Sequence, residues 1–283
     1  MRFVSYARGG VPGIGVMTES GLCGLEAGAE GYPGSLRGLL SRGADLAAVG
    51  AALAAAPTVD TAAIVFSPPI PRPSKILCVG LNYRAHGDET GLGAPAYPEL
   101  FARFPSSLVG HRGAIVKPSV SDRLDYEAEL AAVIGRRCRS ASPSEALGFV
   151  AGYSAFNDAS VRDYQMRTTQ WTVGKNFDAT GGFGPWMVTA DELPPGADGL
   201  RVRARLNGTT MQDGDTGDMT FKVADLVAML SEAMTLEPGD LIVTGTPAGV
   251  GFTRDPPVFM RPGDVCEVEV EGIGTLLNTV AAG

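Results

Sequence analysis

The 283-residue sequence is poor in the residues that most metal and redox motifs use. It has only two histidines, His86 and His111, and its four cysteines stand far apart with no C-x-x-C pair. This argues against a zinc cluster, which needs about four such ligands at short spacing. The first eight residues, Met-Arg-Phe-Val-Ser-Tyr-Ala-Arg, also lack the apolar run of a signal peptide. We therefore expect a cytoplasmic protein with reduced thiols.

Positive charge and long apolar stretches are scarce as well. Lys and Arg total 23 against 31 Asp and Glu, so the net charge is −8, which argues against nucleic acid or an anionic membrane as a partner. The longest apolar-leaning run, residues 46–59, contains Pro57 and is too short to span a bilayer. Hydrophobic residues make up 45% of the chain, which is enough to build a core. The composition predicts a turn-rich globular protein that acts on a small molecule.

Four prolines within six residues, Pro68, Pro69, Pro71 and Pro73, mark the predicted domain boundary, because each fixes its own φ and disfavours helix before it. Residues 1–70 form a small α+β unit with expected strands at 2–6 and 13–17 and a helix at 35–56. None of the chemical motifs lies in this unit, so we expect it to be structural.

Residues 71–283 are predicted to form the catalytic domain. Turn signals such as Asn207-Gly208 and Pro238-Gly239-Asp240 separate its segments. Strands are expected at 75–80, 125–135, 150–156, 200–206, 240–244 and 265–270. Helices are expected at 142–147 and 221–234, the second with Leu226, Leu230 and Met234 as a core-facing stripe. The strands outnumber the helices without βαβ alternation, so the predicted class is α+β, mostly β.

Two acidic residues lie inside the apolar segment 125–135. Glu127 and Glu129 are two apart, so on a strand their side chains share one face. Buried like charges need a shared proton, cationic partners or a hard divalent cation. The alternative is an exposed edge strand with ion pairs to Arg136 or Arg137, and the spacing alone does not decide between the two.

A third carboxylate, Asp158, ends the next apolar strand. Together with Glu127 and Glu129 it would complete one face of an Mg²⁺ or Mn²⁺ site and leave positions for water and substrate.

Other candidate residues lie in loops. His86 precedes Glu89 by one helical turn, where a carboxylate can orient an imidazole that acts as a base; a solvated surface histidine is the alternative. Lys175 could neutralise an anion or extend along the surface. The segment 244–251 (Thr-Gly-Thr-Pro-Ala-Gly-Val-Gly) lacks a nucleotide-loop ending and is expected to close over a small anion. His111 is expected at the surface.

Five ordered blocks together resemble the fumarylacetoacetate hydrolase family from about residue 74 to the C-terminus. They are Val79-Gly80-Leu81-Asn82-Tyr83 with His86 and Glu89, Asp125-Tyr126-Glu127-Ala128-Glu129-Leu130, Gly152-Tyr153 with Asn157-Asp158 and Arg162-Asp163, Gly174-Lys175-Asn176-Phe177-Asp178, and Pro238-Gly239-Asp240 with Thr244-Gly245-Thr246-Pro247. The resemblance implies a mixed β-roll catalytic domain that binds Mg²⁺ or Mn²⁺ in a homodimer.

The resemblance also implies a role for each residue of the site. Glu127, Glu129 and Asp158 would hold the metal, and His86, Glu89, Lys175 and Gln165 would be catalytic. Arg162, Thr246 and Arg103 would bind the substrate. Arg103 stands where many relatives have the lysine of a Phe-x-Lys segment, and this change alters the donor geometry offered to the substrate.

The activity implied first is hydrolysis of a C–C bond in a 2,4-dioxo acid, such as an acylpyruvate or fumarylpyruvate. His86, oriented by Glu89, would activate water, and the metal would stabilise a pyruvate enolate. The alternatives are decarboxylation of a β-keto acid such as oxaloacetate, and isomerisation or hydration of an unsaturated 2-oxo acid. Outside catalysis, a metal-dependent oxo-acid binder is possible. Residues 87–97, punctuated by glycine and proline, are expected to be a substrate-gated lid.

Overall fold

The computed structural model describes residues 1–93 and 95–283. Its largest element is a mixed sheet of eleven strands in the order β3-β2-β1-β13-β11-β10-β16-β5-β6, with β4 beside β1 and β7 beside β13. These strands are β1 (Arg2–Arg8), β2 (Val11–Thr18), β3 (Gly21–Glu26), β4 (Val65–Phe66), β5 (Ile76–Gly80), β6 (Glu99–Arg103), β7 (Leu108–Val109), β10 (Ala128–Ile134), β11 (Val150–Asp158), β13 (Gly181–Thr189) and β16 (Leu241–Val243).

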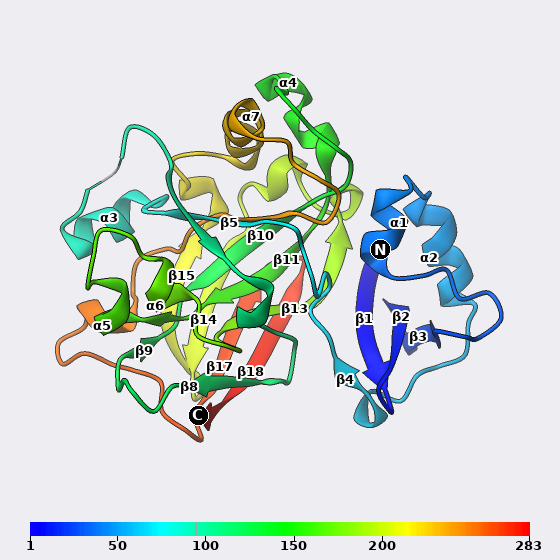
Figure 1. The fold of residues 1–283 in the computed structure, drawn as a ribbon, viewed down its shortest axis with the longest axis horizontal. Coiled ribbons are helices and arrows are strands. Elements are labelled where there is room, and N and C mark those ends of the chain that lie inside the picture. The colour runs from blue at the N-terminus through cyan, green and yellow to red at the C-terminus, as the bar shows by residue number, and fades with distance from the viewer. Residues whose placement is uncertain (94) are drawn as a thin grey trace.

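A second sheet of five strands packs against the first. Its order is β15-β14-β17-β18-β8, and Figure 1 shows it beneath β10, β11 and β13. The core between the two sheets contains Ala132 and Tyr153 from the large sheet and Val202, Val268 and Leu276 from the small one. The strands are β8 (Ala114–Lys117), β14 (Arg201–Leu206), β15 (Thr209–Asp215), β17 (Val265–Val270) and β18 (Gly274–Ala282), and β9 (Leu124–Asp125) with β12 (Ser160–Val161) forms a separate ribbon.

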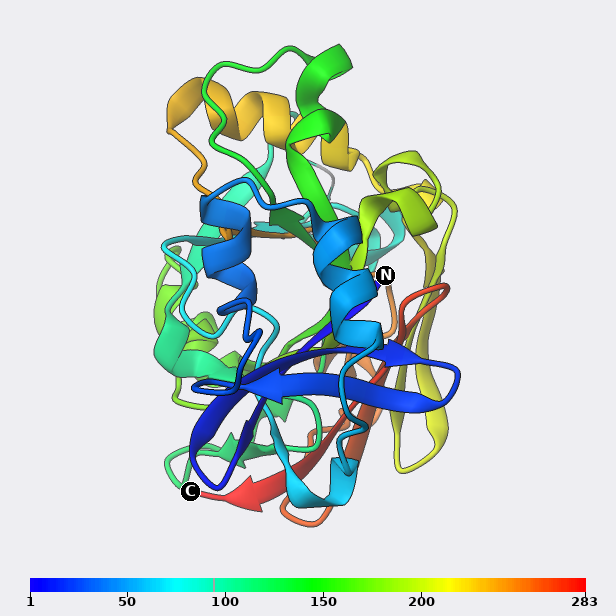
Figure 2. The ribbon, with the colours of Figure 1, turned by 90° about the vertical axis from the view of Figure 1, so that its right-hand side faces the viewer.

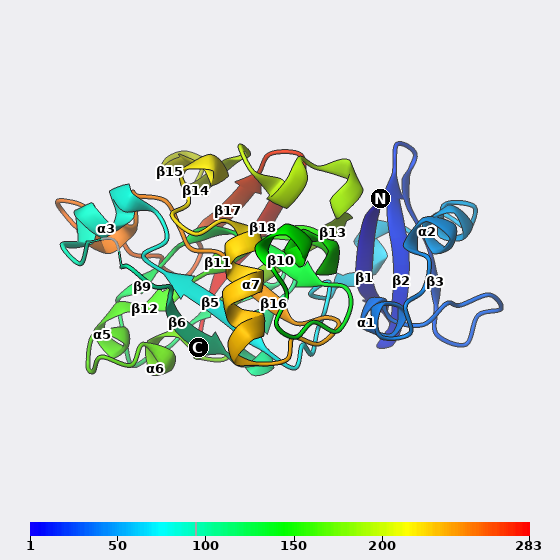
Figure 3. The same cartoon turned by 90° about the horizontal axis from the view of Figure 1, so that it is seen from above.

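Helix α7 (Val223–Ala233) packs beside the short helix α4 (Pro143–Ala146), and Figure 3 shows it from above. Its buried side chains belong to the same apolar cluster as the core between the two sheets. Leu226 and Leu230 are buried in the core as the apolar stripe predicts, while Met234 lies just past the helix end and is partly buried. Within the described residues, no helix has the length and apolarity to cross a membrane. The predicted α+β, mostly β class is confirmed.

The expected helix at 35–56 is instead two helices, α1 (Leu36–Ser41) and α2 (Leu46–Ala54). Gly43 has a φ of +64°, a left-handed conformation that ends α1. Asp45 then caps α2, because its side chain accepts hydrogen bonds from the N–H groups of Ala47 and Ala48. Figure 2 shows both helices lying on strands β1–β3.

The N-terminal residues extend the large sheet. β1 pairs antiparallel with β13 through Arg2↔Val188 and Phe3↔Met187. One apolar cluster joins Leu36 and Leu53 of the N-terminal helices to Phe156 and Leu241 of later strands. The main chain therefore passes the predicted boundary near residue 70 without a break in the sheet or the core, and the division into two domains stays a prediction.

The sequence did not predict the central strand β13. Its pattern of apolar residues is interrupted by Gly181, Gly182, Gly184 and Pro185. The two sheets approach closely here. A Cβ on Gly182 would lie 2.6 Å from Oδ1 of Asn278 in β18, so glycine is required by the packing between layers.

Three short helices gather at the end of the molecule opposite the N-terminal unit, in both Figure 1 and Figure 3. They are α3 (Arg84–Thr90), α5 (Arg162–Gln165) and α6 (Thr172–Lys175). α3 follows β5 of the large sheet, α5 follows β12 of the ribbon, and α6 comes after α5 and contacts it. The candidate residues His86, Arg162 and Lys175 therefore converge at this end.

His111, expected at the surface, is partly buried. Its Nδ1 accepts a hydrogen bond of 3.1 Å from the Leu277 N–H, and its ring contacts Phe66 edge-on with 5.0 Å between centroids. Burial, with a further contribution from the charge of Arg112, lowers its pKa to about 4. The neutral ring therefore joins β4 to the loop before β8.

We predict that His111 makes part of the stability depend on pH. Its folded pKa lies below the ordinary value near 6.5, so its contribution is complete above about pH 6.5 and is lost as the pH falls towards 4, by at most about 1.4 kcal/mol per pH unit. His111→Asn keeps an acceptor for Leu277 but does not titrate. Urea unfolding between pH 4 and 7 should give a flatter profile for this variant than for the wild type, and parallel profiles would contradict the prediction.

Candidate metal centre and active site

Three carboxylates meet where β10 and β11 run side by side. The register pairs Ala128 with Asn157, which sets Glu127 opposite Asp158, and the Asp158 N–H donates to the Glu127 carbonyl at 2.9 Å. One carboxylate oxygen from each of Glu127, Glu129 and Asp158 lies within 4.8 Å of the others, and all three side chains are buried.

The alternative of an exposed edge strand is wrong. β10 lies inside the sheet between β11 and β16. Arg136 instead donates to the Gly148 carbonyl, and Arg137 pairs with Glu237.

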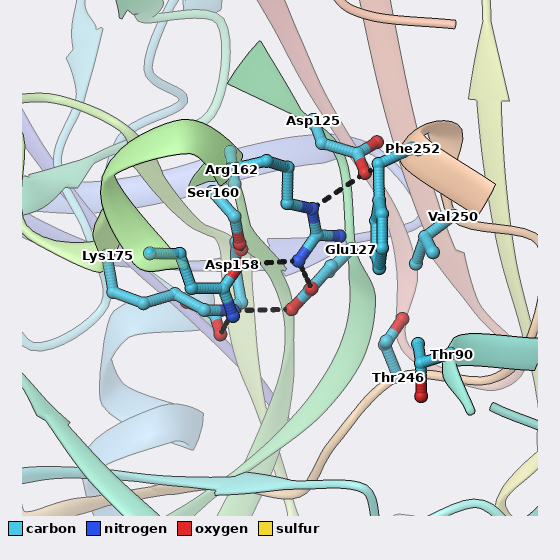
Figure 4. A network of polar contacts seen from close by, with 12 residues as sticks. Thr90, Asp125, Glu127, Asp158, Ser160, Arg162, Lys175, Thr246, Val250 and Phe252 are labelled. Atoms are coloured by element: carbon cyan, nitrogen blue, oxygen red, sulfur yellow. Dashed lines mark hydrogen bonds and ion pairs between the residues drawn. The ribbon is translucent and has the colours of Figure 1, made fainter. Parts of the chain in front are cut away.

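Three buried cations surround the cluster, and Figure 4 shows two of them, Lys175 and Arg162, beside Glu127 and Asp158. Lys175 Nζ donates to Glu127 Oε2 and to Asp158 Oδ2, both at 2.7 Å, so its side chain does not extend along the surface. Arg162 Nη1 lies 2.6 Å from Glu127 Oε1. Arg103 pairs with Asp158 and also donates to Thr180 Oγ1. Glu127 and Asp158 are therefore both paired on two sides.

The carboxylate of Glu129 has fewer partners than those of Glu127 and Asp158. Among the described residues, its recorded hydrogen-bond donor is the Gly245 N–H at 2.6 Å. Burial, together with the charges of Asp158 and Glu127, raises its pKa well above the ordinary value. At Glu127, by contrast, Lys175 and Arg162 outweigh the effect of burial and lower the pKa to about 2.

This arrangement fits a bound divalent cation. Of the four buried carboxylates, counting Asp125 beside Arg162, Glu129 is the one with no recorded cationic partner among the described residues. Mg²⁺ and Mn²⁺ prefer carboxylate oxygens, and Glu127, Glu129 and Asp158 would hold such an ion.

His86 and Glu89 form the predicted pair on α3. His86 Nδ1 lies 2.8 Å from Glu89 Oε1, and the ring is buried rather than solvated. Burial alone would raise the pKa of Glu89, but hydrogen bonds from His86 and from the Gly249 N–H lower it. Glu89 is therefore a carboxylate that can hold the Nδ1 proton, which leaves His86 Nε2 for other partners.

Amides of the segment 244–251, expected to close over a small anion, and of Phe252 after it bind carboxylates of the chain itself. The Gly245 N–H donates to Glu129, the Gly249 N–H to Glu89, and the Gly251 and Phe252 N–H groups to Asp125. The loop thus connects the acidic cluster, the His86–Glu89 pair and Arg162, the partner of Asp125.

Seven of the ten predicted site residues line one cavity, and Glu89, Asp158 and Arg103 do not. His86, Glu127, Glu129, Lys175, Arg162, Gln165 and Thr246 are in its wall. Arg103 is not. It is buried behind Asp158, where it also donates to Ser107, so the structure places it as a positioning residue for that carboxylate.

Two groups of residues at the site were not expected from the sequence. Asp125 is fully buried and accepts a 2.8 Å hydrogen bond from Arg162 Nε; its place in the acidic motif was the available signal. Phe101, Trp171 and Phe252 form the aromatic part of the wall, and no spacing pattern links these distant positions.

The predicted lid, residues 87–97, is only partly described. Gly87–Thr90 belongs to α3, which ends at Gly91 in a left-handed conformation. Residue 94 lies outside the described residues, and lid closure stays a prediction.

We predict that Glu129→Gln weakens binding of Mg²⁺ or Mn²⁺ by more than the roughly 10–100-fold lost when an outer partner of a metal ligand is removed. The amide keeps the size but brings no charge, so the metal-free protein should be as stable as the wild type or more stable. Titration calorimetry and thermal unfolding measure the two effects. Glu19→Gln, on an exposed turn, is the matched control, and unchanged affinity in Glu129→Gln would refute the ligand assignment.

Comparison with known proteins agrees with this architecture. Residues 75–281 match the model of the fumarylacetoacetate (FAA) hydrolase C-terminal family. The chain is 39% identical over 275 residues to the human mitochondrial oxaloacetate tautomerase FAHD2A, covering 95% of this chain and 87% of the relative.

Two solved structures are similar along the whole chain and confirm the predicted fold. The fumarylacetoacetate hydrolase from Exiguobacterium antarcticum has a TM-score of 0.86 and 37% identity, with all of both chains covered. The maleylpyruvate hydrolase from Sphingobium, solved with manganese(II) and pyruvate, has a TM-score of 0.82 and 29% identity, again with all of both chains covered. On the evidence of its site, its fold and its relatives, the chain belongs to the fumarylacetoacetate hydrolase family of enzymes.

Proposed function

We propose that the protein catalyses metal-dependent proton transfer between C3 and the C2 oxygen of a 2-oxo acid, which is keto–enol tautomerisation. The observation that carries this proposal is that His86, already held by Glu89, opens onto the same cavity as the acidic cluster. The name of the human relative, an oxaloacetate tautomerase, supports this choice over the hydrolysis that the sequence motifs put first.

Glu127, Glu129 and Asp158 would hold Mg²⁺ or Mn²⁺. When bound, the cation supplies Lewis-acid polarisation of the 2-oxo group, which acidifies the C3 proton. The manganese in the maleylpyruvate hydrolase structure supports a divalent ion.

His86 is the group that moves the proton. Glu89 fixes Nδ1, so Nε2 takes the proton from C3 and an imidazolium forms beside a carboxylate that stabilises it. The proton then goes to the C2 oxygen, and the reverse sequence converts enol to ketone. Arg162 and Gln165 lie on the cavity wall, where Arg162 Nη1 donates a 2.9 Å hydrogen bond to Gln165 Oε1. Both would bind the substrate carboxylate.

Thr246 is less available to bind substrate than Arg162 and Gln165, because its hydroxyl already has two hydrogen-bond partners. Its hydroxyl donates to the Ala128 carbonyl and accepts from Gln212, which orients it beside the cluster.

Hydrolysis of a 2,4-dioxo acid is the second candidate, because the same His86–Glu89 pair could take a proton from water instead of carbon. Attack of that water at C4 and cleavage of C3–C4 would release pyruvate, the molecule bound in the Sphingobium structure. Decarboxylation needs no base, so this activity would survive loss of His86.

We also propose that the protein forms a homodimer and is located in the cytoplasm.

We predict that His86→Asn lowers C3 hydrogen–deuterium exchange of oxaloacetate in D₂O by about 10²–10⁴-fold with Mg²⁺ present, because general-base catalysis is removed. Metal affinity should change little. Proton NMR of the C3 signal measures the exchange and detects products of acetylpyruvate, fumarylpyruvate and fumarylacetoacetate in the same samples.

His111→Asn is the matched control for this experiment and should exchange at the wild-type rate. If the wild type catalysed neither exchange nor cleavage yet bound oxalate with Mg²⁺, the protein would be an oxo-acid binder rather than an enzyme.

A further inference from the structure

Gln212 of β15 is a buried amide of the small sheet whose hydrogen bonds reach into the site. It is 1% exposed. Its Oε1 accepts a 2.9 Å hydrogen bond from the Ala128 N–H, and its Nε2 donates to Thr246 Oγ1 and to the Pro247 carbonyl, both at 2.7 Å. The oxygen and both N–H bonds of the amide therefore have partners. Gln212 is not in the cavity wall, so its role is not contact with substrate or metal.

The partner of the amide oxygen, Ala128, lies between the two glutamates of the proposed metal site. On this side of β10, the recorded pairing with β16 begins at Ala131. At Ala128 two side chains take the place of that strand: Gln212 accepts from the Ala128 N–H, and Thr246 donates to the Ala128 carbonyl at 2.9 Å. Buried backbone groups need such partners, so these side chains fix the backbone that sets the spacing of the two carboxylates.

The N–H bonds of Gln212 hold the loop after β16. Their acceptors, Thr246 and Pro247, lie between the amide that donates to Glu129 and the amide that donates to Glu89. One side chain thus connects the strand that carries the proposed metal ligands with the loop that orients one of these ligands and the partner of the proposed base.

β15 has an extra residue directly before Gln212. Ala204 of β14 pairs with Gln212. The next residue of β14, Arg205, pairs with Thr210, which leaves Met211 as the extra residue of a β-bulge. Bulges bend a strand and redirect a side chain, and they are frequent beside active sites. Here the bulge comes immediately before the residue that reaches from the small sheet to β10 of the large one.

β15 and the loop are in direct contact around this amide. A Cβ on Gly249 would lie 2.4 Å from the Met211 carbonyl oxygen, and a Cβ on Gly214 would lie 2.4 Å from Cβ of Pro247. Glycine on each side therefore allows the two backbones to approach closely. Gln212 acts within a contact that leaves the loop little room to shift.

We propose that Gln212 is a positioning residue, which fixes Glu127 and Glu129 relative to the loop after β16. The metal affinity of the site then depends on a side chain that contacts neither metal nor substrate. This inference rests on the proposed function, because it assumes that the two glutamates bind the metal. It also makes the small sheet part of the site, through one side chain of β15.

The test measures the Kd of Mn²⁺ by titration calorimetry on the folded protein. Gln212→Met keeps the length of the side chain but leaves the Ala128 N–H and the Pro247 carbonyl without this partner. We expect Kd to rise about 10–100-fold, the usual effect of removing an outer partner of a metal site. An unchanged Kd would overturn the inference while leaving the metal ligands as assigned.

Thr216→Val is the matched control. Thr216 is buried, follows β15, and its hydroxyl donates to the Ala197 carbonyl and accepts from the Leu200 N–H. The change removes two hydrogen bonds to backbone groups outside the site, so thermal stability should fall while the Kd of Mn²⁺ stays at the wild-type value. Equal rises of Kd in Thr216→Val and Gln212→Met would contradict a specific role for Gln212.

Gln212→Asn decides the inference if Gln212→Met does not fold. Its amide is one methylene shorter and cannot reach all three partners, so we expect Kd to change in the same direction, and an unchanged Kd would overturn the inference.

Hydrogen exchange decides the inference even if the wild type binds no Mn²⁺ or Mg²⁺, an outcome that would refute the metal-dependent proposed function. Amides of residues 244–252 should exchange at least about tenfold faster in the Gln212 variants than in the wild type, because the loop opens more often. Amides of β17 should keep their rates. Mass spectrometry of peptides from the two segments measures this, and unchanged exchange in residues 244–252 would refute the positioning role.

Discussion

The repulsion between buried carboxylates where β10 and β11 pair is the constraint on which the rest of the site depends. Glu127, Glu129 and Asp158 cannot all be charged in a core without compensation. The compensating positive charges come from Lys175 of α6, Arg162 of α5 and Arg103 of the edge strand β6. Because these carboxylates must be neutralised, one strand pair constrains the positions of three other elements of the chain.

Backbone amides complete this compensation. The loop after β16 directs its N–H groups at Glu129, Glu89 and Asp125, so one segment holds a proposed metal ligand, the partner of the proposed base and the partner of Arg162. Charge-assisted hydrogen bonds of this kind are stronger than neutral ones. Any shift of the loop would therefore disturb all three functions together, which makes the site a single unit rather than a set of separate groups.

The cavity wall combines charged side chains with aromatic ones. The charged residues Glu127, Glu129 and Lys175 lie in the sequence blocks that resemble the family. Trp171, packed on Gly80, and Phe252, beside Arg162, come from outside those blocks. One fold can host different sites when such residues differ.

The sequence by itself determined the α+β class and the principal strands, because alternation of apolar residues and turn signals are local properties. It also identified the acidic cluster and the His86–Glu89 pair as candidates, since residues two apart on a strand and three apart on a helix share a face. It did not reveal β13, whose glycines are explained only by the close approach of β18, nor the break between α1 and α2 at Gly43. The tertiary structure alone decided that Arg103 lies behind Asp158 rather than in the cavity and that the amides of residues 245–252 bind the protein's own carboxylates. It alone also decided that Phe101, Trp171 and Phe252 line one cavity. These are contacts between residues distant in the chain, and their geometry is set by packing across sheets and loops, which no local pattern in the sequence records.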